Sequence, residues 1–116
     1  MKICIILNDP PYGTERCFNG LRLALALLKA ELKPELSIFL MADAVLCAKA
    51  GQTTPDGYYN LGRMIRGVSR QARVVLCGTC MDARGIGVDE LLEKTERGTM
   101  PDLAQLTLEA DKVLVF

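Results

Sequence analysis

Short apolar runs alternate along the chain with segments in which apolar residues recur every three or four positions. The runs predict strands at residues 2–7, 36–41, 74–77 and 113–116, and the first run is typical of a strand buried on both faces. The helical spacing predicts helices at residues 14–29, 43–50, 58–70, 89–94 and 101–110. We therefore expect one α/β domain over residues 1–116, with a doubly wound, mainly parallel sheet of four to five strands and helices on both faces.

Three segments follow the carboxyl ends of predicted strands, at residues 8–14, 42–45 and 78–87. In doubly wound sheets, ligands bind outside the carboxyl ends of the strands. The third segment is rich in glycine, and we expect it to be a loop that turns sharply before the helix at residues 89–94. Functional residues are expected in these three segments.

Composition and charge exclude several classes of protein. Fourteen basic residues balance fourteen acidic ones, so we expect neither a nucleic acid nor a membrane as partner. The first apolar run stops at Asn8, well short of the roughly 18 to 20 residues of a membrane-spanning helix, and is better read as a strand than as a signal peptide. Five cysteines at irregular spacing do not fit a secreted disulfide framework. We expect a soluble, cytoplasmic protein with reduced thiols.

The strongest chemical signal is the pair Cys77 and Cys80, which stands where the third predicted strand ends. A zinc site needs four ligands, and the chain has neither a histidine nor a second closely spaced cysteine pair, so we expect no metal. No phosphate-binding or dinucleotide-binding glycine motif is present, so we expect no cofactor. A hydrolase triad is excluded because no histidine can serve as the base.

The two cysteines are expected to differ in role. Cys77 continues an apolar strand, so it is expected in the core, where replacement by serine would mainly lower stability. Cys80 is surrounded by polar residues and glycine, and backbone N–H groups of the turn and the charge of Arg84 would favour its thiolate. The predicted catalytic residue is therefore Cys80. The predicted supporting or pocket residues are Cys77, Thr79, Arg84, Asn8 and Tyr12.

Other interpretations of the same residues stay open. Cys77 and Cys80 could form a dithiol redox pair. Alternatively, Asn8, Tyr12 and Arg84 could line a cleft that binds a small anion or metabolite in a non-catalytic oligomeric module. The plainest interpretation is that the cysteines fill the core, that Arg84 is a solvated charge, and that Asn8 and Tyr12 only form turns.

Several segments together form a family pattern: Asn8-Asp9-Pro10 with Gly13-Thr14-Glu15, residues 39–45, residues 57–61, residues 77–85, Leu103-Ala104 and residues 110–116. With these segments the chain resembles the DsrE/DsrF-like family, in particular its small YchN-like members, over essentially its whole length. The block that contains Cys77 and Cys80 is the most specific part. Residues 93–100 depart from the family pattern, because polar residues stand where an apolar strand would be clearer.

The resemblance implies a sheet of about five mainly parallel strands and assembly into homotrimers or homohexamers. Active members of the family carry persulfide sulfur on one cysteine, in a relay between sulfur donor and acceptor proteins. That cysteine corresponds to Cys80 here. The leading hypothesis is therefore a cytoplasmic sulfur carrier, or sulfurtransferase, that accepts sulfane sulfur on Cys80 and passes it to a partner protein.

Overall fold

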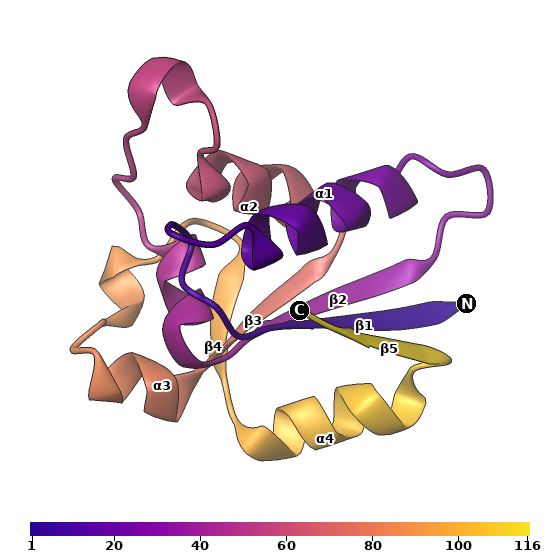
Figure 1. Ribbon diagram of the computed structural model, residues 1–116. Coiled ribbons are helices and arrows are strands. Elements are labelled where there is room, and N and C mark those ends of the chain that lie inside the picture. Colours follow the sequence, from indigo (N-terminus) through magenta and orange to yellow (C-terminus); the bar gives the residue numbers. More distant parts are fainter.

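Five parallel strands form one sheet in the computed structural model, which describes all 116 residues. The spatial order is β4-β3-β2-β1-β5 (Figure 1). The strands are β1 (Lys2–Leu7), β2 (Glu35–Leu40), β3 (Arg73–Cys77), β4 (Thr95–Gly98) and β5 (Lys112–Val115). The expected doubly wound α/β fold is confirmed, and the sheet is parallel throughout.

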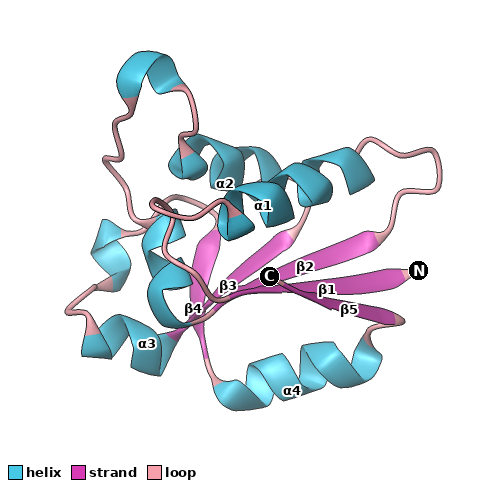
Figure 2. Cartoon of the chain, in the orientation of Figure 1, coloured by secondary structure: helices cyan, strands magenta, loops and turns pink.

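Helices cover both faces of this sheet (Figure 2). The α-helices are α1 (Arg16–Leu27), α2 (Leu61–Ser69), α3 (Gly78–Ala83) and α4 (Met100–Glu109). The 3₁₀ helices are η1 (Ala42–Ala48), η2 (Pro55–Gly57) and η3 (Val88–Glu90). From β1 to β4 the chain advances in one direction across the sheet, and right-handed crossovers place α1 and α2 on one face. The return from β4 to β5 runs the other way, so α4 lies on the opposite face.

The burial of the strands follows their place in the sheet. In β2 and β3 only the first residue is exposed, whereas two of the four residues of the edge strand β4 and three of the four of the edge strand β5 are exposed. One continuous core of 27 buried apolar residues therefore centres on the inner strands. The position of β4 also explains why its sequence is polar, because an edge strand needs little apolar surface. None of the helices is long and apolar enough to cross a membrane.

Two expectations after β3 were wrong. Residues 78–83, expected in a loop, form the helix α3, because the Cys77 side chain caps it by accepting a hydrogen bond from the Cys80 N–H. The helix expected at residues 89–94 is reduced to the single turn η3. There the backbone pairs with η1 instead, through a bridge between Lys49 and Leu91 and a hydrogen bond from Leu92 N to Ala48 O of 2.9 Å.

Three helices also differ from the expectation, two in where they begin and one in its type. The helix expected from residue 58 begins at Leu61, because Asn60 accepts a hydrogen bond from Arg63 N at 3.0 Å and so caps the first turn. Thr14 donates its hydroxyl to Asp9 rather than capping α1, which begins two residues later at Arg16. The segment expected as a helix at residues 43–50 is the 3₁₀ helix η1.

Candidate functional site: a cysteine pair at the carboxyl end of β3

Cys77 and Cys80 stand at the junction of β3 and α3, at the carboxyl end of the sheet. Cys77 is the last residue of the strand and is only 4% exposed, whereas Cys80 lies in the first turn of the helix and is half-buried. The other three cysteines are buried. Cys80 is therefore the cysteine that a reactant from solution can reach.

Cys77 accepts several hydrogen bonds at its sulfur. The backbone N–H of Cys80 donates to Cys77 Sγ at 3.4 Å, and Thr79 Oγ1 lies 3.2 Å from the same atom. Burial acts to raise the pKa of Cys77, but hydrogen bonds from the Cys80 thiol, the Thr79 hydroxyl and the backbone of both residues outweigh it. The net pKa of the Cys77 thiol is lowered, so the negative charge of the pair resides first on Cys77.

Cys80 receives a hydrogen bond from the segment that follows β2. The backbone N–H of Ala42 donates to Cys80 Sγ at 3.2 Å. Ala42 has a φ of 48°, a left-handed conformation that costs an alanine about 1 to 2 kcal/mol. Strained backbone conformations of this kind are concentrated at functional sites. Here the strained conformation of Ala42 accompanies the hydrogen bond from its N–H to the Cys80 sulfur.

The expectation that the surroundings lower the pKa of Cys80 was wrong. Burial, the hydrogen bond to Cys77 and the charge of Cys77 raise this pKa, while the Ala42 N–H and the charge of Arg84 lower it by less. The physical reasons are that burial disfavours the charged thiolate and that two neighbouring thiols cannot both ionise easily. The pKa of Cys77 is thus lowered while that of Cys80 is raised.

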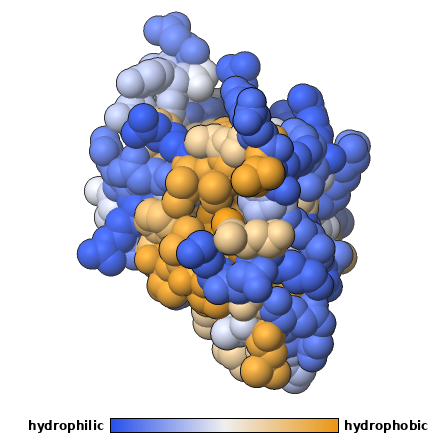
Figure 3. All heavy atoms as spheres, turned by 90° about the vertical axis from the view of Figure 1, so that its right-hand side faces the viewer, coloured by the Kyte–Doolittle hydropathy of each residue, from blue (hydrophilic) through white to orange (hydrophobic).

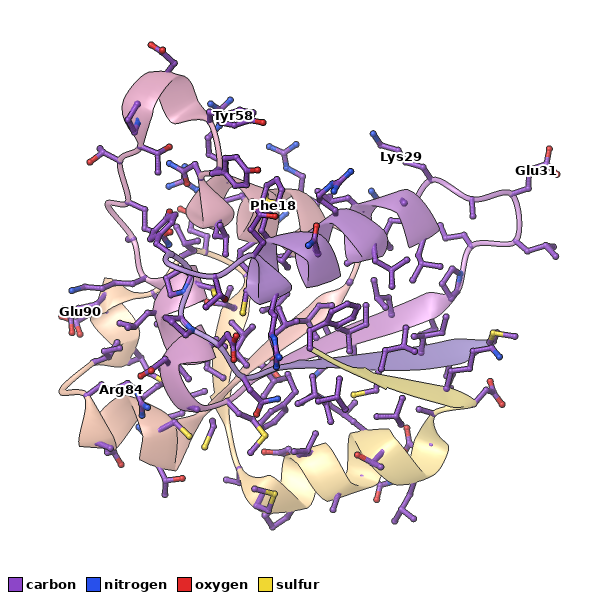
Figure 4. The ribbon with its side chains drawn as sticks, in the orientation of Figure 1. Phe18, Lys29, Glu31, Tyr58, Arg84 and Glu90 are labelled. Carbon is purple, nitrogen blue, oxygen red and sulfur yellow. The ribbon has the colours of Figure 1, made fainter.

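Arg84 ties α3 to η1. Its Nε lies 2.8 Å from Oδ1 of Asp43, and its Nη1 donates to the carbonyl oxygen of Cys80 at 3.0 Å. Figure 4 shows Arg84 on the side of α3 that faces η1. The guanidinium thus holds the backbone of Cys80 in place, and its charge still acts to lower the pKa of Cys80.

Arg97 is a site residue that sequence reasoning missed. A Cβ atom added to Gly78 would lie 2.7 Å from Arg97 Nε, so the guanidinium packs directly over the start of α3. Both terminal nitrogens of Arg97 contact the Asp82 carboxylate at 2.8 Å. Arg97 was missed because the strand β4 was not recognised in the sequence. In the sheet β4 is the parallel neighbour of β3, with Gly98 paired to Cys77 and Arg97 paired to Leu76.

Asn8 and Tyr12 take part in structural contacts. Asn8 Nδ2 donates to the carbonyl oxygen of Phe116 at 3.3 Å. The Tyr12 hydroxyl donates to Gln52 Oε1 at 2.5 Å and accepts from Leu61 N at 3.3 Å. No hydrogen bond joins either side chain to Arg84 or to the cysteine pair. The structure thus brings together Cys77, Thr79, Cys80 and Arg84, and leaves Asn8 and Tyr12 outside this group.

The larger cavities of the surface lie away from the cysteine pair. The largest, of about 480 Å³, lies at the amino ends of β2 and β3, beside Glu35 and Arg73. One of about 380 Å³ lies beside Phe18 and Tyr58, and one of about 350 Å³ lies between α2 and residues 91–94. No set of three or more histidine, cysteine or acidic side chains is arranged to hold a metal ion. The candidate site is therefore a half-exposed thiol beside a buried one, outside these cavities.

Comparison with known proteins matches the whole chain, residues 1–116, to the family model described as the DsrE/DsrF-like family. The chain belongs to the DsrE/DsrF-like family. It is 47% identical to the protein YchN of Escherichia coli K12 over 116 residues, covering 99% of this chain and 98% of YchN. The crystal structure of YchN from E. coli matches with a TM-score of 0.94 and covers 100% of this chain and 99% of that chain.

A more distant structure shows the same fold. The protein of unknown function MTH1491 from Methanobacterium thermoautotrophicum matches with a TM-score of 0.77 at 13% identity, covering 99% of this chain and 98% of that chain. This likeness concerns the fold, whereas the family model over the whole chain and the 47% identity to YchN confirm the resemblance of the sequence to the DsrE/DsrF-like family. The family is associated with sulfur relay in general.

Proposed function

We propose that this member of the DsrE/DsrF-like family is a cytoplasmic sulfur carrier that holds sulfane sulfur as a persulfide on Cys80 and passes it to a partner protein. One observation carries the proposal: the one cysteine that is not buried lies against a second cysteine that ionises more easily. Membership of a family associated with sulfur relay supports it. The partial exposure of Cys80 agrees with cargo handed between proteins.

The loading step needs no oxidant. The Cys80 proton passes to the Cys77 thiolate, with which the Cys80 thiol is hydrogen-bonded. The Cys80 thiolate then attacks the outer sulfur of a donor persulfide. A bond forms between Cys80 Sγ and that sulfur, the sulfur–sulfur bond of the donor breaks, and the donor leaves as a thiolate. Cys77 speeds the step as a proton acceptor but is not required for it, because the half-exposed Cys80 thiol can also give its proton to solvent. The Ala42 N–H and Arg84 hold Cys80 in position.

The proposed partners are sulfur donor and acceptor proteins, together with further copies of this chain in a homotrimer or homohexamer. Exposed apolar side chains support an assembly: Leu108 on α4 is 83% exposed, and Val115 on the edge strand β5 is 64% exposed. Figure 3 shows a broad hydrophobic area on the face that it presents. Apolar surface of this kind is commonly hidden between subunits. Light scattering at micromolar concentration tests the assembly, and a monomer would contradict it.

Thiol mapping tests the proposed carrier. The protein is exposed briefly to a low-molecular-weight alkyl persulfide, quenched with an alkylating reagent, digested and analysed by mass spectrometry. We expect the first added sulfur on Cys80, and we expect a Cys17→Ser control to load like the parent because Cys17 is buried. First loading on Cys4, Cys17 or Cys47 would contradict the proposal.

A dithiol redox protein is a second candidate, favoured by one observation. Cys77 caps α3 and has a lowered pKa, so the pair opens a helix as redox pairs do. Such a protein would exchange electrons with dithiols but would not retain an added sulfur when only Cys80 is left. By contrast, no contact favours the anion-binding module, because Asn8 and Tyr12 are engaged within the chain.

A further inference from the structure

We infer that Cys77 is a resolving thiol, which attacks the persulfide on Cys80, releases its outer sulfur as hydrosulfide and leaves a Cys77–Cys80 disulfide. The inference rests on the proposed function, because it needs a persulfide on Cys80. It adds a second way to unload the carrier: besides handing sulfur to a protein thiol, the chain delivers it as hydrosulfide. A small-molecule acceptor could then use the sulfur.

The position of Cys77 suits this reaction and no reaction with an outside partner. At 4% exposure Cys77 is closed to solvent, yet its sulfur is hydrogen-bonded to the Cys80 thiol and to the Cys80 N–H. Cys77 is the N-cap of α3, and its side chain folds back over the first turn of the helix, where the Cys80 N–H donates to Cys77 Sγ at 3.4 Å. A disulfide between the two would bring their Cβ atoms to about 3.5 to 4.5 Å. Cys80 is thus the one reactant that Cys77 can reach.

The surroundings of Cys77 also favour the attacking form. The Cys80 N–H donates to its sulfur, the Thr79 hydroxyl is hydrogen-bonded to the same atom, and hydrogen bonds from Cys80 and Thr79 lower its pKa. The guanidinium of Arg97 packs over the adjoining Gly78 and interacts favourably with the charge of Cys77. The buried pair of Cys17 and Cys47 cannot substitute, because both are fully buried.

Atoms and charges balance in the step. After loading, Cys77 carries a proton, and the new persulfide has given its own proton to the departing donor thiolate, so that the persulfide carries the negative charge. The proton passes to the outer sulfur, and Cys77 Sγ attacks Cys80 Sγ. The bond between Cys80 Sγ and the outer sulfur breaks, and hydrosulfide leaves with the electron pair. The chain is left as a disulfide, and a dithiol reductant must restore it before another cycle.

A single-turnover experiment tests this step. Reduced protein is mixed anaerobically with a low-molecular-weight alkyl persulfide, excess donor is removed at once, and hydrosulfide and intact mass are followed together. For the parent chain we expect release of hydrosulfide and loss of two hydrogen atoms as the disulfide forms. For Cys77→Ser we expect a stable added sulfur and a hydrosulfide release at least about tenfold slower. Cys77→Ala serves as a second variant, and Cys80→Ser as the control for decomposition of the donor.

Each outcome is decisive. If the parent chain keeps its added sulfur as long as Cys77→Ser does, Cys77 does not resolve the persulfide, although the proposed carrier stands. If Cys77→Ser gains the whole alkylthio group instead of one sulfur atom, the disulfide arises by direct exchange with the donor, and the inference is wrong. If neither protein gains sulfur and no hydrosulfide is released, both the carrier and the resolving step are wrong.

Discussion

Replacing Cys77 separates its role as a helix cap from its role as buried apolar filling. Cys77→Ala removes the acceptor for the Cys80 N–H and leaves a small void at a site only 4% exposed. Loss of a helix cap costs about 1 kcal/mol and the lost sulfur contacts a similar amount, so we expect a loss of about 2 kcal/mol. In Cys77→Ser the hydroxyl keeps the cap, since serine is a preferred capping residue, and Thr79 remains a second partner. We expect a loss of about 1 kcal/mol.

The measurement is thermal unfolding of both variants beside the parent chain, followed by circular dichroism. A difference of about 1 kcal/mol corresponds to about 4 °C in Tm for a chain of this size, so Cys77→Ser should melt about 4 °C above Cys77→Ala. Urea unfolding gives the same comparison as free energies. If the Tm of Cys77→Ser is equal to or below that of Cys77→Ala, the hydrogen bonds of Cys77 do not stabilise the fold. Cys77 would then contribute only as an apolar core residue.

Three further predictions concern the surroundings of the pair. Gly98→Ala should cost about 1 to 3 kcal/mol in urea unfolding, because its Cβ would lie 2.3 Å from a valine methyl of β3; an unchanged midpoint would refute this packing. Thr99→Ala should cost about 1 kcal/mol, because it breaks the capping box of α4. Thr107→Ala on the same helix is its control and should cost clearly less. Arg84→Ala should leave the fold intact but move the pH midpoint of Cys80 alkylation upward, because a charge that lowers this pKa is lost; an unmoved midpoint would make Arg84 a structural tie only.

Much of the fold could be predicted from the apolar pattern. The inner strands read clearly because both of their faces are buried. The edge strand β4 was not evident, because exposed edge positions carry polar residues whose pattern resembles a loop. The short helix α3 escaped detection for another reason: a cysteine caps it, and cysteine is not among the residues that usually mark a helix start.

The candidate site could be located from sequence, but its electrostatics could not. The position of Cys80 near the carboxyl end of the sheet follows from the pattern alone. Which thiol ionises first depends on hydrogen bonds among Cys77, Thr79 and Cys80, and these depend on α3 being a helix. The contact from Ala42 joins residues 38 positions apart in the chain, so no local pattern could reveal its direction.

Cyanolysis of the loaded protein shows directly whether Cys80 carries sulfane sulfur. Cyanide takes sulfane sulfur from a persulfide and forms thiocyanate, which is measured by its colour with ferric iron. Cys77→Ser is treated with an alkyl persulfide, freed of excess donor and then mixed with cyanide. We expect nearly stoichiometric thiocyanate from this protein and only background from the matched double variant Cys77→Ser with Cys80→Ser. Equal thiocyanate from both proteins would contradict the assignment of Cys80 as the sulfur carrier.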